Sequence, residues 1–201
     1  MNRGKIYVIC APSGTGKSTL VNALCKVDSQ VQLSISHTTR PIRPGEVDGV
    51  NYFFVPVDAF ETMIGDNEFL EYAKVYDNYY GTNINTIKNF LATGKDILLE
   101  IDWQGAEQVK KLFPDAILIF ILPPSLEILS ERLHKRNTDS LEVIKKRLDL
   151  ALEEISHAPN FDYLVINDNF DEALLDLRSI IRAPRNKTTR MLTTIKQTFN
   201  F

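Results

Sequence analysis

Four short apolar runs, separated by stretches with helical periodicity, constrain the fold of this chain most strongly. The runs are nearly continuous in isoleucine, leucine and valine, which is typical of parallel strands covered by helices on both faces. They comprise residues 6–10, 97–101, 116–122 and 163–167. Helical patterns lie between them, at residues 17–26, 84–93, 104–113, 125–136 and 171–182. This alternation predicts an α/β fold with a doubly wound parallel sheet.

Two segments break the alternation. Residues 34–82 carry aromatic and β-branched residues between turns, which predicts an inserted, mostly β subdomain. Residues 125–157 carry two helical patterns joined by a polar segment, which suits a hinged helical lid. We therefore expect four parts: a core of residues 1–33, 83–124 and 158–185, a subdomain at 34–82, a lid at 125–157 and a tail at 186–201. The chain from Arg182 onward has five basic residues and no acidic one, and we expect it to fray.

Composition limits the partners of the chain. Its 201 residues suffice for one sizeable core, and a net charge of −3 argues against general nucleic-acid binding. We expect no membrane partner, because no apolar run approaches the roughly 20 residues of a membrane span. Residues 1–5 run directly into the first apolar run, which leaves no room for a signal peptide. Cys10 and Cys25 form no C-x-x-C motif, so we expect reduced thiols and a cytoplasmic protein.

A loop of small residues joins the first apolar run to the first helical pattern. Strand, small-residue loop, Lys-Ser and helix is the context of a phosphate-binding loop of the P-loop NTPase type. Backbone N–H groups and the positive end of the helix dipole would hold the phosphates, and Lys17 would reach the β- and γ-phosphates. Alanine replaces the first glycine of the usual pattern, which is tolerable at negative φ. This phosphate loop comprises Ala11, Pro12, Ser13, Gly14, Thr15, Gly16, Lys17, Ser18 and Thr19.

Two carboxylates mark the end of the second apolar run. Glu100 and Asp102 are two residues apart, so both side chains point to one face of the strand. Together with the Ser18 hydroxyl, they could form the shell of a Mg²⁺ ion that arrives with a nucleoside triphosphate. Asp102 is the more secure candidate, because it lies nearer the carboxyl end of the strand. The alternative is that Asp102 caps the helix that follows.

Two groups of arginines suggest further anion contacts. Arg40 and Arg43 lie in a loop stiffened by two prolines, which we call the arginine loop (residues 36–46). Guanidinium groups match phosphate oxygens in bidentate fashion, so this loop suits a second phosphate. Arg132, Arg136 and Arg147 fall in the expected lid, from which they could stabilise charge on a transferred phosphoryl group. A solvated charged surface is the alternative explanation for both groups.

Taken together, the motifs resemble the guanylate kinase family, which phosphorylates GMP with ATP. The resemblance spans residue 6 to about residue 185 and rests on A-P-S-G-T-G-K-S-T, S-H-T-T-R-P-I-R-P-G-E, N-Y-Y-G-T and I-D-W-Q-G. The arginine loop and N-Y-Y-G-T are specific to this family, whereas the phosphate loop is not. Lys135 and Asn137 depart from the glycines that often flank the second lid arginine.

The resemblance implies two sets of nucleotide contacts. ATP would contact the phosphate loop and Asn167, and the catalytic residues would be Lys17, Arg40, Arg132, Arg136 and Arg147. Glu71, Ser36 and Thr82 would read guanine, whose N1–H and 2-amino group are adjacent donors that suit one carboxylate. Adenine would leave that carboxylate unpaired. The implied GMP contacts are Ser36, Arg40, Arg43, Glu46, Tyr52, Glu71, Tyr80, Gly81, Thr82 and Asp102.

The sequence therefore predicts an enzyme that transfers a phosphoryl group from Mg²⁺-bound ATP to GMP, and also to dGMP. A non-catalytic guanylate-kinase-like domain that binds proteins is one alternative, although such domains typically lose the lysine-containing loop. A kinase for another phosphorylated acceptor is the second alternative. Both a monomer and a homo-oligomer are compatible with the sequence.

Overall fold

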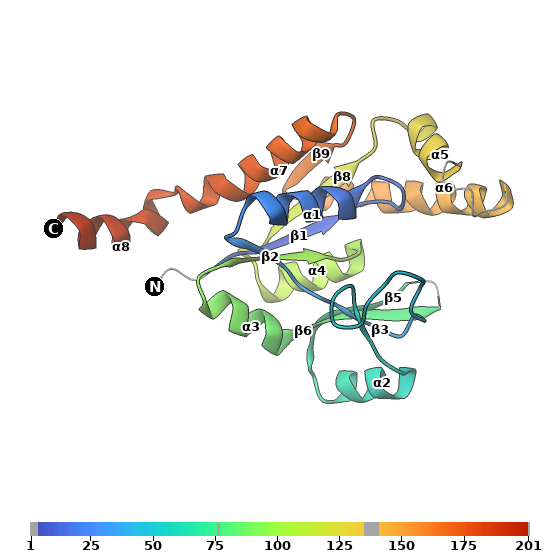
Figure 1. Cartoon of the computed structure of the whole chain (residues 1–201), viewed down its shortest axis with the longest axis horizontal. Helices are drawn as coiled ribbons and strands as arrows, with labels where there is room; N and C mark the ends of the chain where they lie inside the picture. The colour runs from blue at the N-terminus through green and yellow to red at the C-terminus, as the bar shows by residue number, and fades with distance from the viewer. Residues whose placement is uncertain (1–3, 76, 135–140, 201) are drawn as a thin grey trace. The chain divides into compact units, whose positions relative to one another are not determined.

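A computed structural model of the chain describes residues 4–75, 77–134 and 141–200, without the side chains of residues 141–144 and 193. The chain divides into two compact units. The first unit holds Gly4–Cys10 and Val31–Leu118, and the second unit holds Ala11–Gln30 and the chain from Ile119 onward. Figure 1 labels most of the helices and strands that are named below.

Three parallel strands form the sheet of the first unit. They are β1 (Ile6–Cys10), β2 (Val31–Leu33) and β7 (Asp96–Glu100), with β7 pairing with both others. All five residues of β1 are buried, as expected for a strand covered on both faces. The expected strands 6–10 and 97–101 are confirmed, the second with a shift of one residue. Strand β2 was not expected, because three residues are too few to show a period.

Helices α3 (Ile84–Ala92) and α4 (Trp103–Leu112) begin at side-chain caps in the first unit. The Asn83 side chain accepts hydrogen bonds from the backbone N–H groups of residues 85 and 86, and Gly94 follows α3 with φ of 80°. Asp102 Oδ1 accepts the N–H of Gly105 at 2.8 Å. Short polar side chains at N-caps satisfy first-turn N–H groups that lack partners inside the helix. Both predicted helices are confirmed within one residue.

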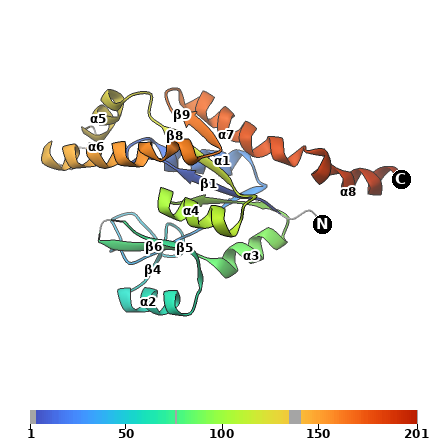
Figure 2. The ribbon, with the colours of Figure 1, turned by 180° about the vertical axis from the view of Figure 1, so that it is seen from behind.

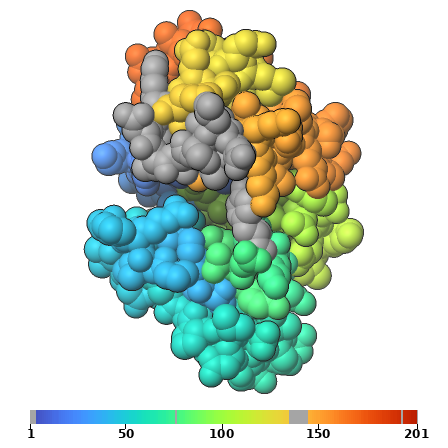
Figure 3. Space-filling model, turned by 90° about the vertical axis from the view of Figure 1, so that its right-hand side faces the viewer, coloured from blue at the N-terminus to red at the C-terminus, as the bar shows by residue number. Residues whose placement is uncertain are grey.

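The insert of the first unit is a second sheet with one helix against it. Its strand order is β4 (Phe53–Phe54), β3 (His37–Thr38), β6 (Asn78–Asn83) and β5 (Phe69–Val75). Helix α2 (Val57–Gly65) was not predicted. Its buried Phe60 stacks on Phe69 and Tyr79, at ring-centroid distances of 4.4 Å and 5.2 Å. In Figure 3, the light-blue arginine loop lies beside the teal and green β5–β6 hairpin, in line with the β3–β6 pairing.

The second unit contains a parallel strand pair and most of the remaining helices. Strands β8 (Ile117–Leu122, whose first two residues belong to the first unit) and β9 (Tyr163–Ile166) are paired. A cluster of Leu129, Leu133, Ala151 and Leu148 holds two helices together within the expected lid. The helices of this unit are α1 (Lys17–Val27), α5 (Leu126–His134), α6 (Leu141–Ser156), the 3-10 helix η1 (Ala158–Asn160), α7 (Phe170–Arg185) and α8 (Thr188–Phe199).

These elements confirm the α/β fold with parallel strands, and they correct one expectation. The chain does not fray after Arg182, because α7 continues to Arg185 and α8 follows. The division into core, insert, lid and tail stays a prediction. No helix within residues 4–75, 77–134 and 141–200 combines the length and apolarity needed to cross a membrane.

Candidate active site

The phosphate loop of the second unit depends on two glycines with left-handed backbone. Gly14 and Gly16 have φ of 90° and 93°, a region that other residues rarely adopt. A Cβ at Gly14 would also lie 2.9 Å from Leu133 Cδ2 of α5, so no larger residue fits there. Ala11 is not among the described non-glycine residues with positive φ, which agrees with the substitution expected to be tolerable.

The loop leads into a helix start that has no side-chain cap. Gly16 is the N-cap of α1 and offers no side chain to the N–H groups of the first turn. Such a terminus presents the positive end of the helix dipole, which suits an anion. Lys17 is half-buried and Ser18 is exposed in this first turn. Lys17, Ser18 and Thr19 of the predicted phosphate loop therefore lie together in the first turn of α1.

The backbone carbonyl of Thr15, in the phosphate loop, accepts hydrogen bonds from two other predicted residues. Asn167 Nδ2 donates to this oxygen at 2.7 Å, and Arg132 Nη1 donates to it at 3.4 Å. Arg132 Nη2 also donates to the Asn167 carbonyl at 3.0 Å. The sequence analysis missed this role of Thr15, because a backbone acceptor leaves no sequence signal. The structure thus joins the phosphate loop, α5 and the end of β9 within the second unit.

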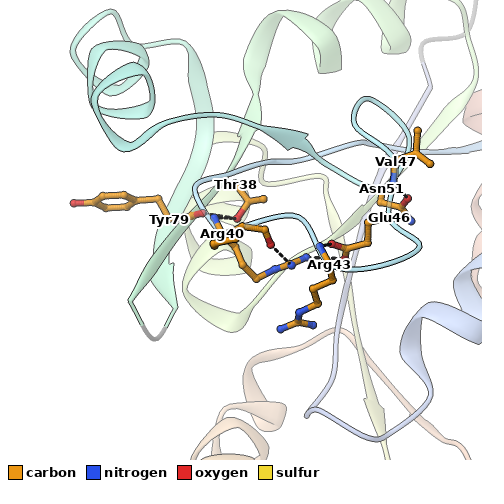
Figure 4. A network of polar contacts seen from close by, with 8 residues as sticks. Thr38, Arg40, Arg43, Glu46, Val47, Asn51 and Tyr79 are labelled. Carbon is orange, nitrogen blue, oxygen red and sulfur yellow. Dashed lines mark hydrogen bonds and ion pairs between the residues drawn. The ribbon is translucent and has the colours of Figure 1, made fainter. Parts of the chain in front are cut away.

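In the first unit, Glu46 organises the arginine loop (Figure 4). Arg40 Nη2 donates to Glu46 Oε1 at 2.7 Å, and the backbone N–H of Arg43 donates to Glu46 Oε2 at 2.8 Å. The pKa of Glu46 is lowered, chiefly by the hydrogen bond from Arg40. The Arg43 side chain is exposed and extends away from this network in Figure 4. The arginine loop thus uses the backbone of Arg43 and leaves its side chain exposed.

Aromatic rings surround the Arg40 guanidinium. Its Cζ atom lies 5.5 Å from the centroid of the Tyr52 ring and 5.7 Å from that of Phe54. Tyr52 is 6.0 Å from Tyr80, measured between ring centroids. Cation–π attraction of this kind holds a guanidinium in place without neutralising it. The structure therefore brings together Arg40, Glu46, Tyr52 and Tyr80, as the sequence predicted.

Strand β5 of the β5–β6 hairpin carries a buried carboxylate. Glu71 is 3% exposed and pairs in register with Thr82, which is fully buried. Among the described residues, neither Glu71 Oε1 nor Thr82 Oγ1 has a hydrogen-bond partner. Burial raises the pKa of Glu71 to about 7; the charge of Asp102 acts in the same direction and the nearby Thr82 opposes it. The Oε1 atom of Glu71 thus lacks the donor that a buried acceptor normally has.

Comparisons with known proteins show which family the chain belongs to. The family model for guanylate kinase matches residues 3–184. The chain is 57% identical to the guanylate kinase of Hydrogenovibrio crunogenus, over 90% of this chain and 89% of that one. The chain belongs to the guanylate kinase family.

Other members of the family extend the match. The guanylate kinase of Sodalis glossinidius is 54% identical, over 94% of this chain and 93% of that one. The crystal structure of guanylate kinase from Anaplasma phagocytophilum superposes with a TM-score of 0.81 at 31% identity, covering 100% of this chain and 97% of that one. These guanylate kinases favour neither of the two alternative functions.

Other predicted residues of this guanylate kinase have structural roles. The side chain of Asp102 caps α4, so the alternative raised for it is observed. A Cβ at Gly81 would lie 2.9 Å from Phe69 Cδ1 and 3.0 Å from Phe60 Cζ, so aromatic packing alone accounts for this glycine. Ser36 is buried, and its carbonyl oxygen accepts a hydrogen bond from the backbone N–H of Phe53 at 2.9 Å.

The remaining predicted residues are placed as follows. Arg147 is half-buried on α6, and Arg136 lies outside the described residues. Glu100 ends β7 and is half-buried. Where the structure describes the chain, it holds no group of three or more His, Cys, Asp or Glu residues that could bind a metal ion. The assignment of Ser18, Asp102 and Glu100 to a metal shell stays a prediction.

Proposed function

We propose that the two units divide the work of ATP-dependent GMP phosphorylation, the reaction of this family. The second unit binds ATP through the phosphate loop, and the first unit binds GMP through the arginine loop and Glu71. One observation carries the assignment of GMP: a carboxylate that is 3% exposed has an Oε1 atom with no partner among the described residues. Guanine offers two adjacent donors to such a group. A kinase of free nucleotides is expected to work in the cytoplasm.

The phosphate of GMP is assigned to the arginine loop. Glu46 binds the Arg40 guanidinium and the backbone N–H of Arg43, so the Arg40 side chain and the backbone of the arginine loop are positioned before a ligand arrives. Pre-positioned guanidinium groups lose less entropy on binding, and each can contact two phosphate oxygens. Tyr52 and Tyr80 lie beside Arg40 and could donate their hydroxyl protons to the same phosphate.

Phosphoryl transfer then requires mainly positioning and positive charge. An oxygen of the GMP phosphate attacks the γ-phosphorus of ATP in line, the bond from this phosphorus to the β–γ bridging oxygen breaks, and ADP leaves. The attacking phosphate is already anionic near neutral pH, so no strong general base is needed. Lys17 and the first turn of α1 hold the triphosphate, while Arg132, Arg136 and Arg147 stabilise the charge that develops.

A Mg²⁺ ion that binds with ATP fits the available donors. Mg²⁺ commonly takes one or two carboxylates together with phosphate and water oxygens, rather than a cage of protein ligands. Ser18 offers a hydroxyl in the first turn of α1, and Asp102 and Glu100 offer carboxylates. When bound, the ion neutralises charge on the β- and γ-phosphates.

The test is an assay of ADP release at fixed ATP and Mg²⁺, with GMP, dGMP, AMP, UMP and CMP as acceptors. We expect GMP and dGMP to be preferred, and Glu71→Gln to lower kcat/KM for GMP by about 100-fold, because a charged hydrogen bond is lost. Equal use of AMP by the unmodified enzyme would contradict the proposal. An unchanged selectivity in Glu71→Gln would remove this residue from base recognition.

A further inference from the structure

Glu71 rests directly on a glycine of helix α4. A Cβ added at Gly105 would lie 2.5 Å from Glu71 Oε2 and 3.1 Å from its carboxyl carbon. Gly105 is buried and helical, and it is not among the residues with positive φ. Glycine is a poor helix former, so neither conformation nor propensity explains its presence here. The close approach of the carboxylate does explain it.

The same helix is tied to the strand that carries Glu71. Gln108 Oε1 accepts the backbone N–H of Tyr72 at 3.2 Å, and Gln108 Nε2 donates to the Tyr72 carbonyl at 2.8 Å. Strand β5 is an edge strand of its sheet, so its outer N–H and C=O groups need partners from elsewhere. Figures 1 and 2 show α4 beside β5 from opposite sides.

The two contacts lie on one face of α4. Gly105 and Gln108 are three residues apart, and positions i and i+3 of a helix are neighbours on its surface. The hydrogen bonds of Gln108 fix the backbone next to Glu71. The approach to Gly105 sets the distance between the Glu71 side chain and the helix. The Oε1 atom has no hydrogen bond among the described residues, so the packing of the carboxylate, which includes its close approach to Gly105 of α4, contributes to its position.

We propose that Gly105 and Gln108 are positioning residues that set the selectivity for guanine by holding the Glu71 carboxylate at a fixed distance from the donor edge of the base. This inference rests on the proposed role of Glu71 as the group that reads guanine. A methyl group at position 105 would displace the carboxylate, and a misplacement of about 1 Å at a binding group can cost about 100-fold in rate. Loss of the Gln108 amide would let β5 move relative to α4.

The experiment compares GMP with IMP, which keeps N1–H and O6 but lacks the 2-amino group. In the full-length enzyme, we expect Gly105→Ala to lower kcat/KM for GMP by about tenfold or more, mainly through KM. The kcat/KM for GMP divided by that for IMP should also fall by about tenfold. The KM for ATP should stay within about twofold of the value of the unmodified enzyme. Gln108→Leu adds no volume at Glu71 and should change the ratio in the same direction by a smaller factor, about threefold.

A matched control and a compensating variant separate positioning from general damage. Gly65→Ala adds the same methyl group at an exposed position of the same unit where nothing lies within 4 Å, so we expect unchanged kinetics. Glu71→Asp shortens the acid by one methylene and makes room for the added methyl group. The double variant Gly105→Ala with Glu71→Asp should therefore be less impaired than the product of the two single effects.

The outcomes distinguish the two proposals. If Glu71→Gln collapses the GMP to IMP ratio while Gly105→Ala and Gln108→Leu leave it unchanged, the positioning role is overturned and base recognition by Glu71 stands. Strictly additive effects in the double variant would also overturn the positioning role. If Glu71→Gln itself leaves the ratio unchanged, both assignments are wrong.

Discussion

The two units build their candidate binding groups from different kinds of atoms. In the second unit, backbone atoms dominate: the uncapped first turn of α1 and the Thr15 carbonyl organise the phosphate loop. In the first unit, side chains dominate, through the Arg40–Glu46 ion pair and the buried Glu71 carboxylate. Backbone donors suit the binding of a triphosphate, which is common to many nucleotides. A desolvated carboxylate suits selection of one base, because only a base with matching donors can pair with it. Substitutions should therefore affect the two units in different ways.

The largest effect is expected in the second unit. Lys17→Ala removes the cation predicted to reach the β- and γ-phosphates, and we expect kcat to fall by about 1,000-fold or more. The melting temperature should change little, because Lys17 is only half-buried in the first turn of α1. Steady-state kinetics and thermal melting measure both quantities. An unchanged turnover would exclude the loop lysine from the mechanism.

The arginine loop offers a matched pair of substitutions. Arg40→Ala should raise KM for GMP by about 100-fold and lower the stability, because Glu46 and the Tyr52 ring both lose a partner. Arg43→Ala should raise KM for GMP by about tenfold with no change in melting temperature, since its side chain is exposed. An effect confined to the KM for ATP would mean that the arginine loop does not bind GMP.

A change of pH should alter the binding of GMP, which we assign to the first unit, through the ionisation of Glu71. The pKa of Glu71 is about 7 in the ligand-free protein, and guanine donors favour the ionised form. Binding of GMP therefore releases a proton, and affinity should increase as pH rises through 7. Between pH 8 and pH 6, we expect KM for GMP to rise by about tenfold as pH falls. Glu71→Gln cannot titrate and should lose this part of the pH dependence, which also controls for ionisation of the GMP phosphate.

The smallest effect is expected for the side chain that supports the phosphate loop. Asn167→Ala removes the 2.7 Å hydrogen bond to the Thr15 carbonyl and leaves that oxygen with only the longer bond from Arg132. We expect KM for ATP to rise by about fivefold, as for a lost neutral hydrogen bond, with KM for GMP unchanged. A larger effect on GMP than on ATP would contradict the division of work between the units.

Local patterns were sufficient for most of the fold. The apolar runs predicted β1 and β7, and the helical periodicity predicted α3 and α4 within one residue. Helix α2 was missed because only Phe60 of its residues is buried, so its apolar period is weak. Gly81 also has a packing role that its sequence context did not show, since a Cβ there would lie 2.9 Å from Phe69 Cδ1 and 3.0 Å from Phe60 Cζ; its contact with GMP stays a prediction.

For the candidate site, local spacing was enough to predict the phosphate loop and the arginine loop, because glycines and prolines control the conformation of the nearby backbone. Only the tertiary structure decided that Glu71 is buried with an unpaired oxygen and that Gly105 and Gln108 lie against its strand. Desolvation depends on all the atoms around a group, and those atoms come from strands and helices far apart in the chain. No local pattern encodes this desolvation, so the binding strength of a carboxylate becomes evident only once the chain has folded.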